Sequence, residues 1–232
     1  MEQVFFNGVG VYPFPNRKTL LHFIGNKKGI LVAINAEKIM NATPQIRDVI
    51  NDNIGYADGI GAVLALKRRG IKTAVKIPGC ELWLDIVKAG YKNKVFYLVG
   101  GKQEVIEATV DKLKSEYPEI NIIGYRNGYI TSESERKALI CVVVEKKPDV
   151  VFVAMGSPKQ ELLMMDMQKV HEAIYMGLGG SFDVYMGNVK RAPKYFVDMG
   201  LEWFYRLLRQ PSRIKRQIIM FRYILLLYLN KI

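Results

Sequence analysis

The sequence predicts an α/β protein with a mainly parallel sheet and helices on both of its faces. From residue 30 onward, apolar runs rich in β-branched residues alternate with stretches of helical periodicity. The apolar runs are almost continuous, which is typical of strands buried on both faces, and several of them end in glycine. Together these observations favour a Rossmann-like arrangement, in which ligands bind beyond the carboxyl ends of the strands.

Six strands and six helices are expected in this alternation. One strand ends at Ala57, and the other five read GILVAIN, VFYLVGG, INIIGY, DVVFVAMG and AIYMGLGG. The helices are expected over residues 36–51, 59–69, 80–90, 102–116, 133–147 and 157–170. In the last of these, Ser157 is the expected N-cap and Pro158 the first helical residue.

One carboxylate, Asp58, stands between a strand-like run and two glycines in the stretch IGYADGIGAVLA, residues 54–65. Aspartate is a good N-cap, since its side chain accepts hydrogen bonds from the first helical N–H groups. Asp58 would then cap the helix predicted directly after it. The functional interpretation is a catalytic base, because the residue follows a strand at the end where ligands bind. On spacing alone, the N-cap interpretation of Asp58 is favoured over the catalytic one.

The chain is long enough for one main domain and a small appendage, which we place at residues 1–195 and 196–232. Half of its residues are apolar and 24% are charged, which excludes a disordered protein and a bundle of membrane spans. The cysteines and histidines are too isolated for a structural zinc site. Because the N-terminal residues lack a secretory pattern, we expect a cytoplasmic protein.

Positive charge is concentrated near the C-terminus. The net charge is +12, and residues 187–232 hold ten Lys and Arg against Asp198 and Glu202, a surplus of 8. Such a segment indicates an anionic partner. The basic residues are Lys190, Arg191, Lys194, Arg206, Arg209, Arg213, Lys215, Arg216, Arg222 and Lys231.

The same segment has an amphipathic pattern. Pro211 separates two helical stretches, and the second has an apolar stripe beside its basic residues. The apolar part, residues 218–229, is far shorter than the about 20 residues of a bilayer span, so we expect the helix to lie on an anionic membrane surface. The alternatives are a terminal helix pair packed on the domain and a nucleic-acid-binding module. The stripe consists of Ile214, Ile218, Phe221, Leu225 and Tyr228.

Common nucleotide-binding motifs are missing from the chain. It has neither the dinucleotide motif G-x-G-x-x-G nor the P-loop motif G-x-x-x-x-G-K-[ST]. It also lacks the acidic D-x-D pair that would hold a metal against a nucleotide diphosphate. A leaving phosphate would then be stabilised by helix N-termini and cations, and we expect no cofactor and no metal.

Seven stretches, in order, cover nearly the whole chain from about residue 28. They are LVAINAEKIM (31–40), YADGI (56–60), PGCELW (78–83), FYLVGGKQEV (96–105), VAMGSPKQE (153–161), MGLGGSFDVYMGNVKRAPK (176–194) and GLEWFYRLLRQPSRIKRQ (200–217). Together these stretches resemble the WecG/TagA/CpsF glycosyltransferase family, most closely its WecG branch.

The resemblance implies an inverting, metal-independent enzyme at the cytoplasmic face of the bacterial inner membrane. In the WecG branch, N-acetyl-D-mannosaminuronic acid moves from a UDP donor to undecaprenyl-diphosphate-linked N-acetylglucosamine, giving the second lipid-linked intermediate of enterobacterial common antigen. The alternative is the same chemistry with UDP-N-acetylmannosamine or UDP-glucose, for teichoic acid or another surface polysaccharide. The resemblance leaves the oligomeric state open, a homo-oligomer included.

The resemblance also implies site residues. It makes Asp58 the general base, and it places Asn35 and Gln160 in the sugar pocket. Their structural alternatives are a turn residue at a strand end and a first-turn helix residue. The resemblance further implies substrate contacts by Lys76, Gly100, Gly101, Gly156, Ser157, Lys159, Gly179, Gly180 and the appendage arginines Arg206, Arg213 and Arg216.

Two positions depart from the family pattern. Lys76 stands where many relatives have Arg, which keeps the charge but loses the planar two-pronged grip on a phosphate or carboxylate. Ala33 stands where the TagA branch has Thr. The sequence therefore leaves open which cation meets a uronate carboxylate. The candidates are Lys76, Lys102, Lys159 and Lys190.

Overall fold

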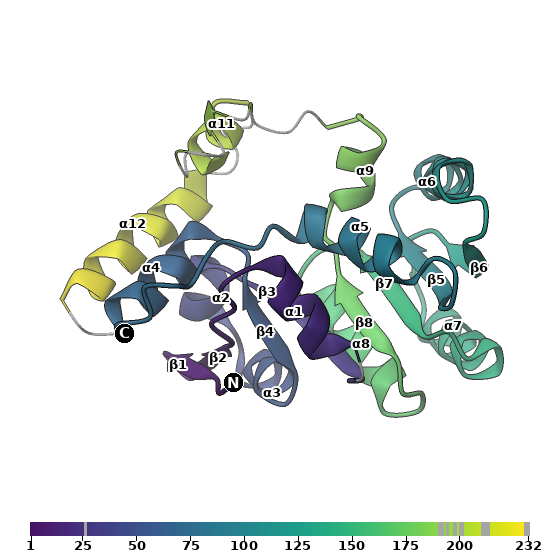
Figure 1. Cartoon of the computed structure of the whole chain (residues 1–232), viewed down its shortest axis with the longest axis horizontal. Coiled ribbons are helices and arrows are strands. Elements are labelled where there is room, and N and C mark those ends of the chain that lie inside the picture. The colour runs from purple at the N-terminus through teal and green to yellow at the C-terminus, as the bar shows by residue number, and fades with distance from the viewer. Residues whose placement is uncertain are drawn as a thin grey trace.

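Six parallel strands form the central sheet of the computed structural model, in the order β4-β3-β8-β7-β5-β6 (Figure 1). This confirms the predicted α/β fold with a parallel sheet. The strands are β3 (Gly29–Ile34), β4 (Ile54–Ala57), β5 (Val95–Gly100), β6 (Asn121–Arg126), β7 (Val150–Ala154) and β8 (Ile174–Gly177). The structure describes residues 1–25, 27–189, 193, 195–196, 199, 202–209 and 214–229.

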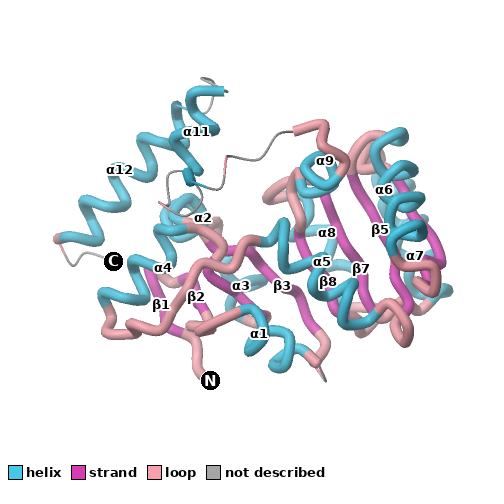
Figure 2. The backbone as a smooth tube through the Cα atoms, turned by 45° about the horizontal axis from the view of Figure 1, so that its top comes forward, coloured by secondary structure: helices cyan, strands magenta, loops and turns pink. Residues whose placement is uncertain are grey.

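Helices cover both faces of this sheet, as predicted (Figures 1 and 2). Their inward side chains separate into two buried clusters, one for each face. The first face is covered by α2 (Ala36–Asn41), α3 (Pro44–Asn51), α4 (Ile60–Arg68), α7 (Glu133–Lys146) and α8 (Lys159–Gln168). The second face is covered by α1 (Arg17–Ile24), α5 (Gly79–Gly90), α6 (Gln103–Glu116) and α9 (Ser181–Tyr185).

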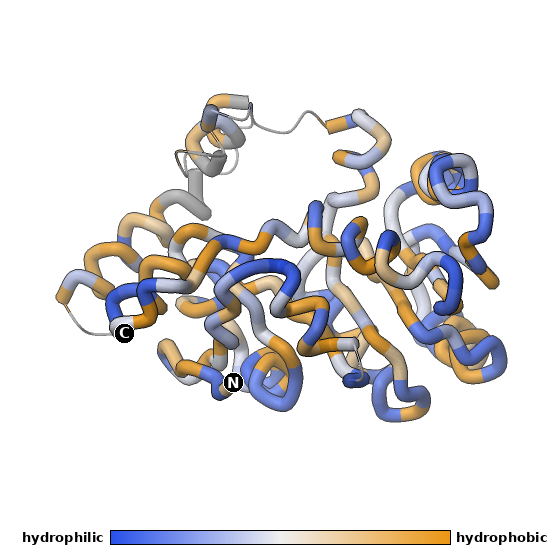
Figure 3. The backbone as a smooth tube through the Cα atoms, viewed as in Figure 1, coloured by the Kyte–Doolittle hydropathy of each residue, from blue (hydrophilic) through white to orange (hydrophobic). Residues whose placement is uncertain are grey.

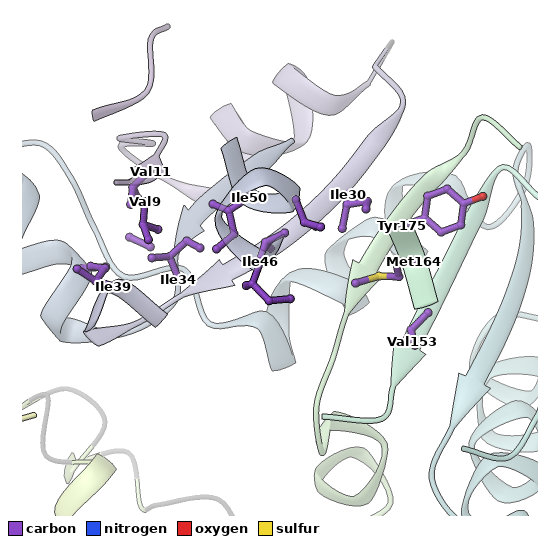
Figure 4. Close-up of a cluster of buried hydrophobic side chains, with 14 of the residues drawn as sticks. Val9, Val11, Ile30, Ile34, Ile39, Ile46, Ile50, Val153, Met164 and Tyr175 are labelled. Atoms are coloured by element: carbon purple, nitrogen blue, oxygen red, sulfur yellow. The ribbon is translucent and has the colours of Figure 1, made fainter. Parts of the chain in front are cut away.

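The strands supply side chains to both clusters in alternation. In β7, Val151 and Val153 belong to the first cluster, whereas Phe152 and Ala154 belong to the second. This is the two-residue period of a strand, and it explains why the sequence runs are apolar without interruption. Figure 4 shows part of the first cluster, where Met164 of α8 lies beside Tyr175 and Val153 of the sheet.

Two predicted helix boundaries are wrong. The helix expected over residues 36–51 is two helices, because Pro44 has no N–H to donate and keeps Thr43 extended, with ψ 160°. Thr43 caps α3 and Pro44 is its first residue. Ser157 does not cap α8, whose N-cap is Pro158 without a side-chain cap bond. The helix begins one residue later than predicted, which leaves Ser157 one residue too early in the chain to act as the cap.

The N-terminal hairpin lies outside the predicted alternation. It consists of β1 (Val4–Phe6) and β2 (Val9–Val11), which pair antiparallel. Asn7 and Gly8 form its turn, with φ values of 49° and 76°. An Asn-Gly pair between apolar residues is the strongest short-range hairpin signal, because both turn residues need positive φ.

Two helices close the described chain, α11 (Glu202–Arg209) and α12 (Ile214–Tyr228). Helix α12 packs on α2 and α4 through Tyr223 and Leu227, which are buried in the first cluster. The Tyr223 hydroxyl donates a hydrogen bond of 3.0 Å to the Gly61 carbonyl oxygen. A Cβ atom at Gly61 would lie 3.1 Å from the Tyr223 ring and 3.0 Å from the Ala36 Cβ, so this close approach needs glycine.

Candidate active site

The carboxyl ends of all six strands lie at one edge of the sheet, and most of the predicted site residues follow them directly. Because the strands are parallel, each one delivers its next loop to the same edge. These loops contain Asn35 after β3, Asp58 after β4, Gly100 and Gly101 at the end of β5, Gly156 after β7 and Gly179 after β8.

The winding of the chain diverges between β5 and β7. The connection that leaves β5 passes through α6 on the second face, whereas the connection that leaves β7 passes through α8 on the first face. Neighbouring strands with diverging connections are the usual ligand position in open parallel sheets. From β5 to β4 the edge spans four strand spacings of about 4.8 Å, roughly 19 Å in all. A ligand that reaches both ends must be elongated.

Asp58 is held at this edge by two backbone hydrogen bonds. Its own N–H donates to the Ile34 carbonyl oxygen at 3.0 Å, which fixes the residue against the end of β3. Its Oδ1 accepts the Gly79 N–H, the first of α5, at 2.7 Å. The N-cap of α4 is Gly59, without a side-chain cap bond, so the expected cap on the following helix is wrong. Asp58 instead satisfies the first turn of a helix that begins 21 residues later.

Asn35 lies next to Asp58. It is the N-cap of α2, where its Oδ1 accepts the Lys38 N–H at 2.9 Å. A Cβ atom at Gly59 would lie 3.0 Å from the Asn35 Cβ, so the loops after β3 and β4 are in contact. The structure thus brings Asn35 and Asp58 together. The oxygen of the Asn35 side-chain amide accepts a hydrogen bond from the protein backbone, which supports the structural alternative for this atom.

Gln160 is buried beneath the loops after β7 and β8, with a side chain only 4% exposed. Its Oε1 accepts two backbone N–H groups, from Gly156 at 3.2 Å and from Gly179 at 2.9 Å. Its Nε2 donates to Glu161 Oε1 at 3.2 Å. The predicted pocket residue therefore joins the two glycine loops to each other, and both ends of its amide are engaged.

The glycines at this edge fall into two groups. At Gly100, with φ +133°, a Cβ atom would lie 2.3 Å from the Ala154 carbonyl oxygen, so glycine is required for the packing of two neighbouring strands. Gly101 has φ +68° and donates its N–H to the same oxygen at 3.1 Å. Gly156 and Gly179 also have positive φ, but nothing lies within 4 Å of a Cβ atom placed there, nor at Gly180. These three open to space at the strand ends, where a ligand can approach the backbone.

A comparison with protein families matches residues 16–232 to the family described as Glycosyl transferase WecG/TagA/CpsF. The chain belongs to this family. It is therefore a glycosyltransferase, with a nucleotide-sugar donor and an acceptor. The match extends through the C-terminal helices, so the family pattern includes the appendage as well as the sheet.

A buried phenol, Tyr56, lies close to the glycosyltransferase's Asp58. Tyr56 is fully buried on β4, and its hydroxyl makes no hydrogen bond in the described part of the protein. Burial raises the pKa of this phenol well above its usual value, and the charges of Asp58, Cys80 and Glu161 raise it further. A Cβ atom placed at Gly79 would lie 2.8 Å from the Tyr56 hydroxyl oxygen and 3.7 Å from Asp58 Oδ1. Gly79 is thus enclosed by the two side chains.

The predicted cations are distributed along the same edge. Lys76 is half-buried beside the end of β4, since the next residue, Ile77, donates its N–H to the Ala57 carbonyl oxygen at 2.7 Å. Lys102 and Lys159 are exposed at the starts of α6 and α8, and Ser157 is exposed in the loop before α8. Lys190 and Arg213 lie outside the described residues, as do the side chains of Arg206 and Arg216.

Four residues of the site were missed by sequence reasoning. Tyr56, Gly79, Lys38 and Glu161 each lie inside one of the family-like stretches, but nothing in their spacing shows what they contact. Among the residues that the structure describes, no group of three His, Cys, Asp or Glu side chains is placed to hold a metal ion. Over the same residues, no helix is long and apolar enough to cross a membrane.

Proposed function

We propose that the protein is an inverting, metal-independent glycosyltransferase that moves N-acetyl-D-mannosaminuronic acid from UDP to undecaprenyl-diphosphate-linked N-acetylglucosamine. This is the step from lipid I to lipid II of enterobacterial common antigen. The observation that carries the proposal is the geometry of Asp58. The carboxylate is half-buried at the carboxyl edge of the sheet, and the Gly79 N–H fixes its Oδ1. The family supplies the reaction class.

Asp58 acts as the general base. The hydroxyl oxygen of the acceptor sugar attacks the anomeric carbon of the donor, and the bond from that carbon to the UDP oxygen breaks on the opposite side. The acceptor proton passes to Asp58, and UDP leaves with the bonding electron pair. Because attack and departure occur on opposite faces, the configuration inverts. An anchored Oδ1 holds the carboxylate in one orientation, which is the condition for proton transfer in the transition state.

The leaving diphosphate gains its stabilisation from helix N-termini and lysines. Helices α4, α5, α6 and α8 all begin at the carboxyl edge, where their first N–H groups favour negative charge. Lys76, Lys102 and Lys159 add formal positive charge along the same edge. The glycines with open space at Gly156, Gly179 and Gly180 let the donor approach the backbone.

Helix α12 supplies the contact with the membrane that holds the lipid-linked acceptor. Its inward residues, Tyr223 and Leu227, are buried on the core, whereas other apolar side chains of the helix are exposed. Figure 3 shows hydrophobic residues along α12. Phe221 is 63% exposed and Tyr228 is 75% exposed. A stripe of this kind beside basic residues suits the headgroup layer of an anionic membrane. The exposed stripe consists of Ile218, Phe221, Leu225, Tyr228 and Leu229.

Helix α12 contacts α2 and α4, the two helices that begin beside Asn35 and Asp58, which supports a link between membrane docking and the site. In Figures 1 and 2, α11 projects on the same side of the molecule as α9, which follows β8. Membrane docking and completion of the active site are then one event. The appendage arginines Arg206, Arg213 and Arg216 are the groups proposed to reach a diphosphate in that event.

A panel of donors tests the substrate. The purified enzyme is incubated with a lipid-diphosphate-linked N-acetylglucosamine acceptor and UDP-N-acetylmannosaminuronic acid, UDP-N-acetylmannosamine or UDP-glucose. We expect turnover with the uronic acid. Turnover of an uncharged sugar alone would replace the donor by the alternative given above, and turnover of none would overturn the proposed reaction. Activity should persist in excess chelator, whereas strict dependence on a divalent ion would contradict the metal-independent mechanism.

The basic surplus also suits a nucleic-acid-binding module, which a binding comparison tests. Flotation with anionic vesicles and a DNA gel shift are run on the same protein. We expect flotation that weakens at high salt, because screening reduces the attraction of Lys and Arg to anionic headgroups. Retention of DNA without vesicle binding would reverse the assignment. Removal of residues 198–232 should abolish flotation and most of the turnover on lipid acceptor, and full activity of that variant would refute coupled docking.

A further inference from the structure

A buried ion pair lies directly beneath the loops of the active site. Lys38 of α2 and Glu161 of α8 come within 2.9 Å, measured from Nζ to Oε1, and their side chains are only 11% and 1% exposed. The second donor contact of Lys38 is to the Ala33 carbonyl oxygen at 2.9 Å, near the end of β3. An ion pair this deep costs desolvation that its Coulombic attraction repays only in good geometry, so its value must be sought in what it holds.

The pair is the centre of a continuous chain of hydrogen bonds. On one side, the Lys38 N–H donates to Asn35 Oδ1, at the start of the same helix. On the other side, Glu161 Oε1 accepts from Gln160 Nε2, and Gln160 Oε1 accepts the N–H groups of Gly156 and Gly179. The chain thus joins the loops after β3, β7 and β8, which are neither adjacent in sequence nor connected by any one element.

We propose that Lys38 and Glu161 are positioning residues of the glycosyltransferase: their ion pair fixes the Gln160 amide, and through it the relative placement of the two glycine loops against which the donor binds. The role of these loops in donor binding rests on the proposed function. Neither side chain is exposed enough to touch a substrate, so the pair acts through Gln160, Gly156 and Gly179.

The titration of Glu161 makes the stability of the fold depend on pH in a way that reports on the ion pair. Burial favours its neutral form, but the Lys38 charge and its hydrogen bond lower the pKa of Glu161 below the ordinary value. The pair therefore stabilises the fold above the ordinary glutamate pKa, and this contribution is lost as the pH falls through the lowered pKa. Among the described residues, two further groups interact with Glu161 and are neutral at these pH values. They are the Gln160 amide, which donates a hydrogen bond to it, and the Tyr56 phenol, whose pKa is raised by burial and by neighbouring charges that include Glu161.

Three variants of the full chain test the proposal: Lys38→Met, Glu161→Gln, and the two together. Lys38→Met leaves a buried carboxylate without its cation, whose pKa then rises above the ordinary value, so the variant loses stability as the pH rises through that raised pKa. This sign is opposite to the wild-type behaviour. In the double variant no buried charge remains, and the amide introduced at position 161 still offers an oxygen to Gln160, so the pH dependence disappears.

The matched control is Arg136→Met, because Arg136 contacts the same helix α8 at Asp166 and at the Leu162 carbonyl oxygen, away from the glycine loops. We expect Lys38→Met to raise the KM for the UDP-sugar about tenfold or more, with a smaller change in kcat, since a misplacement of about 1 Å can cost about 100-fold. The double variant restores KM. Arg136→Met lowers the melting temperature without changing KM.

Hydrogen exchange separates this proposal from the proposed function. The amides of Gly156 and Gly179 should exchange about tenfold or more faster in Lys38→Met than in wild type, at a temperature where both are folded, if loosening the Gln160 amide costs about 1.4 kcal/mol in local opening. They should be slow again in the double variant. Unchanged exchange at both glycines would overturn the positioning role whatever the enzyme transfers. A wild-type protein that turns over none of the UDP-sugars would refute the proposed reaction and leave the exchange result intact.

Discussion

Two neighbouring parts of the sheet's carboxyl edge, one at β4 and β3 and one at β8 and β7, are built in different ways. At the β4–β3 part, the half-buried Asp58 carboxylate accepts the Gly79 N–H at one oxygen, and the Asp58 N–H donates to the Ile34 carbonyl oxygen. At the β8–β7 part, the polar side chains Gln160 and Glu161 lie below the surface, and the backbone at Gly156, Gly179 and Gly180 faces open space. The first arrangement suits proton transfer, and the second suits binding of a ligand along its length. The difference indicates that chemistry and donor binding are separable by mutation.

The largest effect is expected at the β4–β3 part of the edge, which holds Asp58. Asp58→Ala removes the proposed general base, so kcat should fall by about 10²–10⁴, the usual contribution of general acid–base catalysis, while the KM for the donor changes little. Steady-state kinetics with the lipid acceptor measure both values. Asp52→Ala is the control, because Asp52 is exposed at the C-terminal end of α3. Equal falls in kcat in the two variants, or a rise in KM without a fall in kcat in Asp58→Ala, would contradict the distinction between the β4–β3 part and the β8–β7 part.

A second variant disturbs the same carboxylate without changing it. Gly79→Ala places a methyl group 2.8 Å from the Tyr56 oxygen, so the first turn of α5 must move and its N–H leaves Asp58. We expect kcat to fall about 100-fold, the cost of a misplacement of about 1 Å.

The cause of this loss is checked by relief of the contact. Tyr56→Phe removes the oxygen that the new methyl group meets, so the double variant Gly79→Ala, Tyr56→Phe should recover much of the lost kcat. Failure of the double variant to recover, although it is as stable as wild type in thermal unfolding, would show that Gly79 does not act through this contact.

A third variant addresses the glycine loops. Gly179→Ala adds a methyl group into open space at a backbone with φ +57°, where it narrows the approach to the peptide groups. We expect the KM for the donor to rise about tenfold, equivalent to about 1.4 kcal/mol of binding, with kcat less affected.

Backbone strain is separated from this effect by Gly70→Ala. Gly70 has φ +87°, again with nothing within 4 Å, but it follows the far end of α4. The strain costs both variants about 1–2 kcal/mol of stability, and only the first should change KM. A matched rise in KM for Gly70→Ala would mean that strain, not obstruction, is being measured.

The smallest effect is expected where helix α12 packs on α2 and α4, the helices that follow β3 and β4. Tyr223→Phe loses the hydrogen bond to the Gly61 carbonyl oxygen, worth about 0.5–1.5 kcal/mol, and keeps the buried ring. Urea denaturation should report a loss of this size, and hydrogen exchange in α12 should quicken, while the donor KM stays unchanged. A larger change in donor KM than in turnover of the lipid acceptor would show that α12 acts on the glycine loops after β7 and β8 instead.

Much of the fold could be predicted from the sequence, since the helix and strand periods are local. The alternation predicted a mainly parallel sheet with helices on both faces, and the glycine-ended runs predicted the edge where the candidate site lies. The N-terminal hairpin was missed although Asn7-Gly8 signals it, and so was the break before Pro44, whose missing N–H signals a helix start. The signal at Pro44 was outweighed by the longer helical pattern over residues 36–51, and the hairpin lies before residue 30, where the predicted alternation begins.

The sequence by itself determined the candidates for the site: a lone acid after β4, glycines at or after the ends of β5, β7 and β8, and a basic, partly apolar C-terminus. Only the tertiary structure decided their partners. Asp58 meets Gly79, Gln160 meets two loops, and Lys38 meets Glu161, all across distances in sequence that no local period encodes. Likewise, Ile218, Phe221, Leu225 and Tyr228 of the predicted stripe are exposed, and Tyr223 faces the core. Periodicity gives the spacing of apolar residues on a helix, but the side that docks depends on which neighbour leaves room, here Gly61.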